Sequence, residues 1–352
     1  MLIDDSLTVR TIFARMVESD PGMQVVDTAS SAERGISQLK NVTADVILLD
    51  IEMPGMGGLE ALPSILEVAP NTQVMVVSSL TEDGAEATVR ALSTGAADTM
   101  LKPRPGGFNE EYRAQLIGKI RALGGEERDG KAIAHSAQAR TKLSKPERAA
   151  KKPAVLAIGA STGGIHALNI MLRALTPEFR LPILITQHLP SSFIPVFARQ
   201  IEVASGRPTH IAEEGTQIRS GEIAIATGHG HMVLRRIADR LVVRTSTELA
   251  RSGCMPSVDP MLESLAKSCE GRALAVILSG MGRDGYQGAS ALCEAGGAVW
   301  AQNAETSAVW GMPGAVAKAG LTSLVASPEA LAAALMELCT ATGSAEVVPS
   351  AV

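Results

Sequence analysis

The sequence has few aromatic residues and no long, uninterrupted apolar run. It contains two Trp, two Tyr and five Phe among 352 residues, and its formal net charge is −5. Nucleic-acid-binding surfaces favour basic faces and aromatic side chains on which bases stack, so this composition argues against a nucleic-acid partner. No apolar run approaches the roughly 18 residues that span a membrane, and Asp4 and Asp5 interrupt the region where a signal peptide would be apolar. We therefore expect a cytoplasmic protein without membrane insertion.

The sequence also lacks the cysteine pairs typical of metal or redox motifs. Its four cysteines form no CxxC pair and lie in apolar or helical-looking segments: Cys254, Cys269, Cys293 and Cys339. Reduced thiols that pack in the interior of a cytosolic protein are the expected interpretation. Cys254 is included in it, because nothing in its local sequence suggests an activated thiol.

Short apolar runs alternate with helical patterns throughout, which predicts an α/β fold. About five strand–helix units precede residue 124, the size of a flavodoxin-like doubly wound domain. The strands expected there are 1–3, 23–28, 44–50, 72–79 and 98–103, with a closing helix over 108–123. After residue 153 the alternation restarts and predicts a larger, doubly wound, mainly parallel domain with an antiparallel hairpin. Its expected strands are 154–160, 181–187, 222–227, 240–245, 273–280, 298–303 and 323–327. The hairpin is expected to pair 222–227 with 240–245.

The domain boundaries follow from changes in composition. The segment 124–152 has few large apolar residues and an excess of Lys and Arg, which indicates a solvated linker. A basic docking segment for an acidic partner is the alternative interpretation. We expect a first domain over 1–123, the linker over 124–152, a second domain over 153–342 and a frayed tail over 343–352.

Acidic and basic side chains stand where successive strands of the first domain end. Asp4 and Asp5 follow the first strand, Asp50 ends the strand 44–50, and Lys102 follows the apolar residues of the last strand, 98–103. In a doubly wound sheet, the carboxyl ends of the strands meet at the ligand crevice. Clustered carboxylates repel one another unless a cation lies among them, and oxygen-only ligands suit Mg²⁺.

These residues resemble the response-regulator receiver family over positions 1 to 123, through IDDS, LLDIEMPGMGGLEAL, VVSS and LKP. The resemblance implies that Asp50 accepts a phosphoryl group from a CheA-type histidine kinase with Mg²⁺ bound. The residues implied are Asp5, Asp50 and the Glu52 backbone carbonyl as Mg²⁺ ligands, Asp4 assisting through water, and Ser78 and Lys102 as phosphoryl contacts. Two features depart from the family pattern: the first strand is clipped to three residues, and Thr99 stands at a usually aromatic position.

The second domain opens with a candidate nucleophile. A strand leads into Gly159-Ala160-Ser161-Thr162-Gly163 and then into a helical pattern, the nucleophile-elbow arrangement. The pattern is weak in a chain with 33 glycines. A phosphate-binding loop is the competing interpretation, but the segment lacks its G-K-[ST] ending.

A base and an acid stand at matching positions. His188 follows the strand 181–187, and Asp284 follows the strand 273–280. All three groups thus lie at carboxyl ends of strands, which predicts a Ser161, His188 and Asp284 triad. The order Ser, His, Asp differs from that of α/β-hydrolases, which run Ser, Asp or Glu, His.

From residue 153 to about 340 the sequence resembles the catalytic domain of the CheB protein-glutamate methylesterase family. The motifs are IGASTGG, TQHLP, CMPSVDPMLESL, ILSGMGRDG and VWGMPGAV. The resemblance implies a phosphorylation-regulated hydrolase that needs no cofactor for the ester chemistry, acts on glutamate γ-methyl esters of methyl-accepting chemoreceptors, and deamidates receptor glutamines. It also implies that Met281 offers its backbone N–H to the oxyanion and that Thr162 shapes the pocket. We expect a monomer whose unphosphorylated first domain covers the Ser161 crevice.

Two other functions remain open at this point. One is a receiver coupled to a catalytically inactive docking module, which the complete triad disfavours. The other is a receiver with a DNA-binding output, for which no helix-turn-helix pattern is evident. His229 and His231 could bind a metal, but no third ligand is evident near them, so a hairpin turn at the substrate groove is the preferred interpretation.

Overall fold

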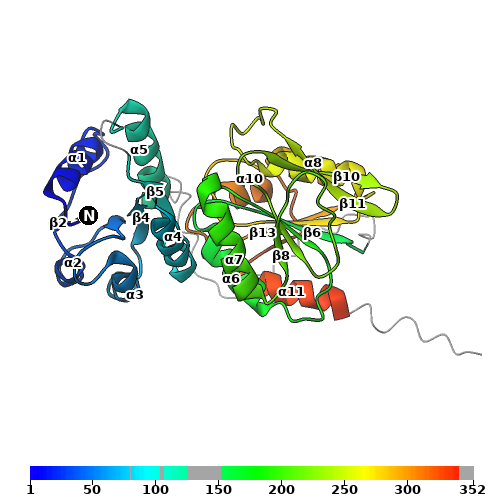
Figure 1. Ribbon diagram of the computed structural model, residues 1–352, viewed down its shortest axis with the longest axis horizontal. Helices are drawn as coiled ribbons and strands as arrows, with labels where there is room; N and C mark the ends of the chain where they lie inside the picture. The colour runs from blue at the N-terminus through cyan, green and yellow to red at the C-terminus, as the bar shows by residue number, and fades with distance from the viewer. Residues whose placement is uncertain (80, 104–106, 126–151, 341–352) are drawn as a thin grey trace, which may run out of the picture. The chain divides into compact units, whose positions relative to one another are not determined.

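The computed structural model describes residues 1–79, 81–103, 107–125 and 152–340, which form two compact units (Figure 1). The predicted tail over 343–352 and nearly all of the predicted linker over 124–152 lie outside the described residues. Within those residues, no helix is long and apolar enough to cross a membrane.

The first unit is a parallel sheet with the strand order β2-β1-β3-β4-β5, which is the predicted flavodoxin-like order. Its elements are β1 (Leu2–Ile3), α1 (Leu7–Glu18), β2 (Thr28–Ala29), α2 (Ala32–Leu39), β3 (Val46–Asp50), α3 (Gly58–Val68), β4 (Gln73–Ser78), α4 (Glu82–Thr94), β5 (Asp98–Leu101) and α5 (Glu110–Gly124).

The strand expected over 23–28 is much shorter than predicted. Only Thr28 and Ala29 pair with β1, because β1 itself offers just Leu2 and Ile3 as partners. Val26, within the expected strand, is 40% exposed. The length of β2 therefore matches the two residues that β1 provides for pairing.

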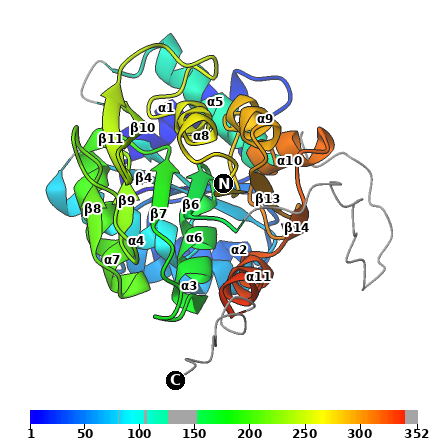
Figure 2. The same cartoon turned by 90° about the vertical axis from the view of Figure 1, so that its right-hand side faces the viewer.

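The second unit is a larger parallel sheet with the strand order β14-β13-β12-β6-β7-β9-β8. Helices α8, α9 and α10 cover one face of it, and α6, α7 and α11 cover the other (Figure 2). The elements of this unit are β6 (Val155–Ala160), α6 (Gly164–Ala174), β7 (Ile183–Gln187), η1 (Ser191–Phe193), α7 (Ile194–Ser205), β8 (Thr209–Ile211), β9 (Ile223–Ile225), β10 (His231–Ile237), β11 (Arg240–Ser246), α8 (Val258–Ser268), β12 (Ala273–Ile277), α9 (Tyr286–Glu294), β13 (Ala298–Gln302), α10 (Met312–Lys318), β14 (Leu324–Ala326) and α11 (Pro328–Thr340).

An antiparallel hairpin is present, but its predicted pairing was wrong. The partner of β11 is β10, which runs antiparallel to it from His231↔Ser246 to Ile237↔Arg240. The segment predicted as that partner contains β9, which instead joins the parallel sheet between β7 and β8. The connection between β10 and β11 is only two residues, so local pairing of adjacent chain segments prevails over the more distant pairing.

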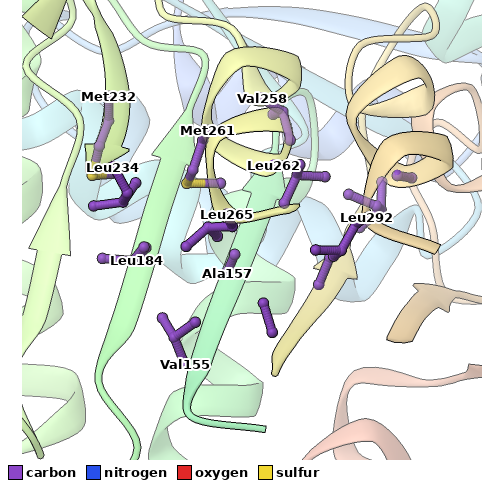
Figure 3. Packing of buried hydrophobic residues seen from close by; sticks show 14 of the residues in the cluster. Val155, Ala157, Leu184, Met232, Leu234, Val258, Met261, Leu262, Leu265 and Leu292 are labelled. Carbon is purple, nitrogen blue, oxygen red and sulfur yellow. The ribbon is translucent and has the colours of Figure 1, made fainter. Parts of the chain in front are cut away.

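The core of the second unit joins this hairpin to the sheet through α8. Val155, Ala157 and Leu184 from the sheet face Leu262 and Leu265 of α8, with Met232 and Leu234 of the hairpin beside them (Figure 3). Each of these side chains is at most 3% exposed. Burying one large apolar side chain contributes about 1.5–3 kcal/mol, so this packing holds α8 firmly against the sheet.

Candidate functional site

The first unit brings its predicted acidic residues to one edge of its sheet. Ile3 is in register with Leu49, so Asp4 and Asp50 follow side by side. The Lys102 backbone N–H donates to the Ser78 carbonyl at 2.7 Å, which aligns the ends of β4 and β5 with that edge. Side-chain oxygens of Asp4, Asp5 and Asp50 lie within 4.8 Å of one another.

The charges at this edge are unbalanced. Lys102 Nζ lies 2.6 Å from Asp50 Oδ2 and 3.3 Å from Asp4 Oδ2, so one cation serves two buried carboxylates. Burial raises the pKa of Asp50 to about 6; the hydrogen bond from Lys102 opposes this shift and the Asp4 charge adds to it. A further hard cation would relieve this repulsion, so the donor set fits Mg²⁺.

Two other residues predicted for this site lie close by. The Ser78 hydroxyl is fully buried and has no hydrogen-bond partner among the described residues. It is therefore free to donate to an acceptor such as a phosphoryl oxygen. The Glu52 N–H donates to Asp50 Oδ1 at 3.0 Å, whereas the role of the Glu52 carbonyl stays a prediction. Thr99, at the usually aromatic position, is buried on β5.

In the second unit, strand register places the candidate nucleophile next to the candidate base. Ala160 pairs with Gln187, so Ser161 and His188 are the next residues of neighbouring strands. The His188 N–H donates to the Ala160 carbonyl at 3.0 Å, and Gln187 Nε2 donates to the Ser161 carbonyl at 3.0 Å. These two bonds fix the backbones on which the hydroxyl and the imidazole are carried.

His188 and Asp284 are in direct contact. His188 Nε2 lies 2.7 Å from Asp284 Oδ2, and the carboxylate side chain is 1% exposed. This leaves Nδ1 as the ring nitrogen available to Ser161. Among the described residues, Ser161 Oγ makes no hydrogen bond to His188, and such bonds are often long in enzymes without bound substrate.

The pKa values of this pair move in opposite directions. Burial lowers the pKa of His188, but the hydrogen bond to Asp284 and the neighbouring Cys254 outweigh this effect and raise the pKa to about 9. Burial raises the pKa of Asp284, but the His188 bond and the donors around it bring it down to about 2. The pair therefore favours an imidazolium beside a carboxylate, the charge state that forms when a histidine takes a serine proton.

The Asp284 carboxylate is held by the N-terminus of α8. The Ser257 hydroxyl donates to Oδ1 at 2.6 Å, and the Val258 N–H donates to Oδ2 at 2.7 Å. The Gly285 N–H donates to Oδ1 at 3.0 Å. Unpaired N–H groups and the positive end of the helix dipole stabilise an anion there.

A buried histidine fixes Ser257 in turn. His231 Nδ1 accepts the Ser257 N–H at 2.9 Å, and its other nitrogen, Nε2, lies 2.8 Å from the Glu248 carbonyl. His231 is 1% exposed and lies on β10, so it is a structural residue of the hairpin and not part of a turn. Both of its ring nitrogens are engaged in these contacts.

The predicted oxyanion donor lies on the loop after β12. A Cβ at Gly280 would come within 2.9 Å of Ser161 Cβ, so the backbone that leads into Met281 passes beside the candidate nucleophile. The Gly280 carbonyl accepts from Met312 N at 2.8 Å and its N–H donates to Val309, which anchors this loop. Thr162 directly follows Ser161, before α6. The roles of Met281 and Thr162 stay predictions.

Family models match both units. The CheB methylesterase model matches residues 156–335, about half of the chain. The chain belongs to the CheB methylesterase family. The response regulator receiver domain model matches residues 1–107, so this family member carries a receiver domain ahead of its CheB methylesterase domain.

Two named relatives match this chain over more than nine-tenths of their own length. The chain is 38% identical to "protein-glutamate methylesterase/protein-glutamine glutaminase 1" of Rhodospirillum rubrum, over 92% of this chain and 91% of the relative. It is 40% identical to "protein-glutamate methylesterase/protein-glutamine glutaminase 2" of Caulobacter vibrioides, over 92% and 94% respectively. The crystal structure of the Thermotoga maritima CheB methylesterase catalytic domain is 31% identical, with a TM-score of 0.52, and covers 53% of this chain and 100% of that one.

Sequence reasoning missed three residues that surround the CheB candidate triad. Gln187 and Ser257 stand inside the quoted motifs TQHLP and CMPSVDPMLESL, but a motif does not say which atoms its residues contact. Cys254 was interpreted as packing, yet its sulfur lies within 4.8 Å of a His188 nitrogen and an Asp284 oxygen. The raised pKa of His188 reflects the hydrogen bond to Asp284 and then this neighbour, which no pattern in the sequence indicates.

Proposed function

We propose that the chain is a phosphorylation-regulated hydrolase that removes methyl groups from glutamate γ-methyl esters of chemoreceptors, with Ser161 as nucleophile. The observation that carries the proposal is the His188–Asp284 pair, 2.7 Å apart, whose members follow the two strands that flank the one presenting Ser161. Family membership supports the same chemistry.

The first half of the reaction forms an acyl-enzyme. Ser161 Oγ attacks the ester carbonyl while His188 takes the hydroxyl proton, and the imidazolium then passes that proton to departing methanol. Asp284 stabilises the imidazolium and keeps the ring oriented. The backbone N–H of Met281 and the N-terminus of α6 are the groups proposed to stabilise the oxyanion.

The second half repeats these steps with water. His188 removes a proton from water, which attacks the acyl carbonyl, and then returns the proton to Ser161. A receptor glutamine would follow the same route with ammonia as the leaving group. We therefore propose deamidation as a second activity of the same residues, in keeping with the glutaminase part of the relatives' names.

Regulation is assigned to Asp50 in the receiver domain. Asp50 would accept a phosphoryl group from a CheA-type histidine kinase, with Ser78 and Lys102 contacting its oxygens. Asp5, Asp50 and the Glu52 carbonyl would hold Mg²⁺, with Asp4 assisting through water; the cation supplies charge neutralisation for the incoming phosphate. We propose that the protein works in the cytoplasm as a monomer, and that its substrate is the receptor protein.

The test measures methanol released from receptor-containing membranes that carry radiolabelled methyl esters. We expect Ser161→Ala in the full chain to lower the rate by about 10⁴-fold or to the detection limit. Ser327→Ala is the matched control, because Ser327 caps α11 and has no contact with the triad. Methanol release by Ser161→Ala at the wild-type rate would contradict the proposal and leave a docking role instead.

Regulation is tested on the same full chain. A small phosphodonor with Mg²⁺ should raise the rate severalfold in the wild type and leave Asp50→Asn unchanged. Equal stimulation of both proteins would exclude Asp50 as the phosphoryl acceptor, and the proposal that Ser161 hydrolyses the ester would remain valid.

A further inference from the structure

Cys254 lies beside the candidate triad without belonging to it. Its sulfur, a His188 ring nitrogen and an Asp284 carboxylate oxygen all lie within 4.8 Å of one another. The residue is in the segment between β11 and α8, three positions before Ser257, whose hydroxyl binds Asp284. The structure therefore places a nucleophilic atom against the proposed general base.

The local contacts of the thiol are weak. Cys254 Sγ lies 3.8 Å from the Ser252 carbonyl, and its backbone N–H donates to Ser252 Oγ at 3.3 Å. The side chain is half-buried, and the neighbouring Met255 is 40% exposed, so a small reagent can approach from solvent. A packing role alone does not account for a partly accessible sulfur beside two ionisable groups.

The other cysteines whose side chains are described differ from Cys254. Cys269 is 1% exposed within the hydrophobic core. Cys293 is half-buried like Cys254, but its thiol donates to the Leu321 carbonyl at 3.4 Å, and burial raises its pKa. Cys293 is therefore a matched internal control: similar exposure, without an imidazole.

We propose that Cys254 is a covalent modification site, at which hydroperoxides oxidise the thiol to a sulfenic acid and thereby switch off hydrolysis at Ser161. The inference rests on the proposed esterase function for its effect, but not for the reactivity of the thiol. The sulfur lies beside an imidazole that is placed to take the thiol proton, and peroxide is attacked by the deprotonated sulfur.

The oxidation balances with the groups present. The thiol proton moves to the neutral form of the His188 imidazole, and the sulfur electron pair attacks one peroxide oxygen, so that an S–O bond forms and the O–O bond breaks. The leaving hydroxide takes the proton back from the His188 imidazolium and becomes water. The sulfur is oxidised by two electrons and the peroxide is reduced by two.

The product would interfere with the esterase at His188. A sulfenic oxygen is a stronger hydrogen-bond partner than a thiol and lies within reach of the imidazole. It would compete with Ser161 for the ring nitrogen that must accept the serine proton. Reduction by an added thiol would reverse the change, because sulfenic acids are the reversible stage of cysteine oxidation.

The experiment treats the full chain with hydrogen peroxide and traps sulfenic acid with dimedone. Peptide mass spectrometry then quantifies the adduct at each cysteine, and methanol release is followed in parallel as a fraction of each protein's own starting rate. We expect the adduct at Cys254 before Cys293, loss of methanol release in the wild type and in Cys293→Ser, and resistance in Cys254→Ser. Dithiothreitol added in place of dimedone should restore the rate.

His188→Gln separates the chemistry from the esterase function. Removing the imidazole should slow formation of the Cys254 adduct about threefold or more, because the thiol loses the neighbouring group that takes its proton. A His188-dependent adduct in a chain without esterase activity would support the modification site and refute the proposed function. Equal adduct rates at Cys254 and Cys293, or equal inactivation of Cys254→Ser and the wild type, would overturn the inference.

Discussion

Replacing Ser257 with alanine tests whether the α8 N-terminus positions the triad. The substitution removes the 2.6 Å hydrogen bond to the buried Asp284 carboxylate, and a bond to a charged group contributes about 1.5–3 kcal/mol. It also removes the cap on the Asp259 N–H, which contributes roughly 0.5–2 kcal/mol. We expect the free energy of unfolding of the second unit to fall by about 3 kcal/mol.

The effect on catalysis should be much smaller than loss of the acid itself. The Val258 and Gly285 N–H groups still hold the carboxylate at 2.7 and 3.0 Å, so Asp284 keeps its charge and its contact with His188. We expect kcat/KM to fall about tenfold, equivalent to about 1.4 kcal/mol, against roughly 10⁴-fold when a triad aspartate is neutralised.

Both quantities can be measured on the full chain. The two tryptophans, Trp300 and Trp310, lie in the second unit, so their fluorescence in a denaturant titration reports that unit. Ser327→Ala is the control: it removes a helix cap of the same type, and should cost about 1 kcal/mol without changing kcat/KM. If Ser257→Ala matched this control in both measurements, the positioning role of the α8 N-terminus would be refuted.

Three further predictions concern pH, phosphorylation and packing. His188 must be neutral to accept a proton and its pKa is raised to about 9, so kcat/KM should rise with pH through about 9. Cys254→Ser should shift this rise in kcat/KM to lower pH, because Cys254 helps to raise the His188 pKa. A pH–rate profile corrected with an inactive variant measures both. Lys102→Ala should weaken stimulation by a small phosphodonor while leaving the unstimulated rate unchanged, measured as methanol release with and without the donor. Leu262→Ala should lower the free energy of unfolding of the second unit by about 3 kcal/mol in the same fluorescence titration, whereas Leu249→Ala, at a position 94% exposed, should change it by less than about 0.5 kcal/mol.

The order of elements and the candidate residues of the site were readable from the sequence. Alternating apolar runs indicate parallel strands, and in such sheets the residues at or just after the carboxyl end of each strand face the crevice, which singles out Asp50, Ser161 and His188 without coordinates. This works because strand and helix periodicities are local properties of ten to fifteen residues.

Pairing and contacts across long separations were decided by the tertiary structure alone. The strand β9 joined the parallel sheet, whereas β10 paired with β11 across a two-residue connection. Ser257 and Cys254 reach Asp284 and His188 because α8 packs against β6 and β12 through buried side chains such as Leu262 and Leu265. Sequence periodicity marks the buried face of a helix, but which loop atoms its N-terminus brings together depends on how whole layers pack.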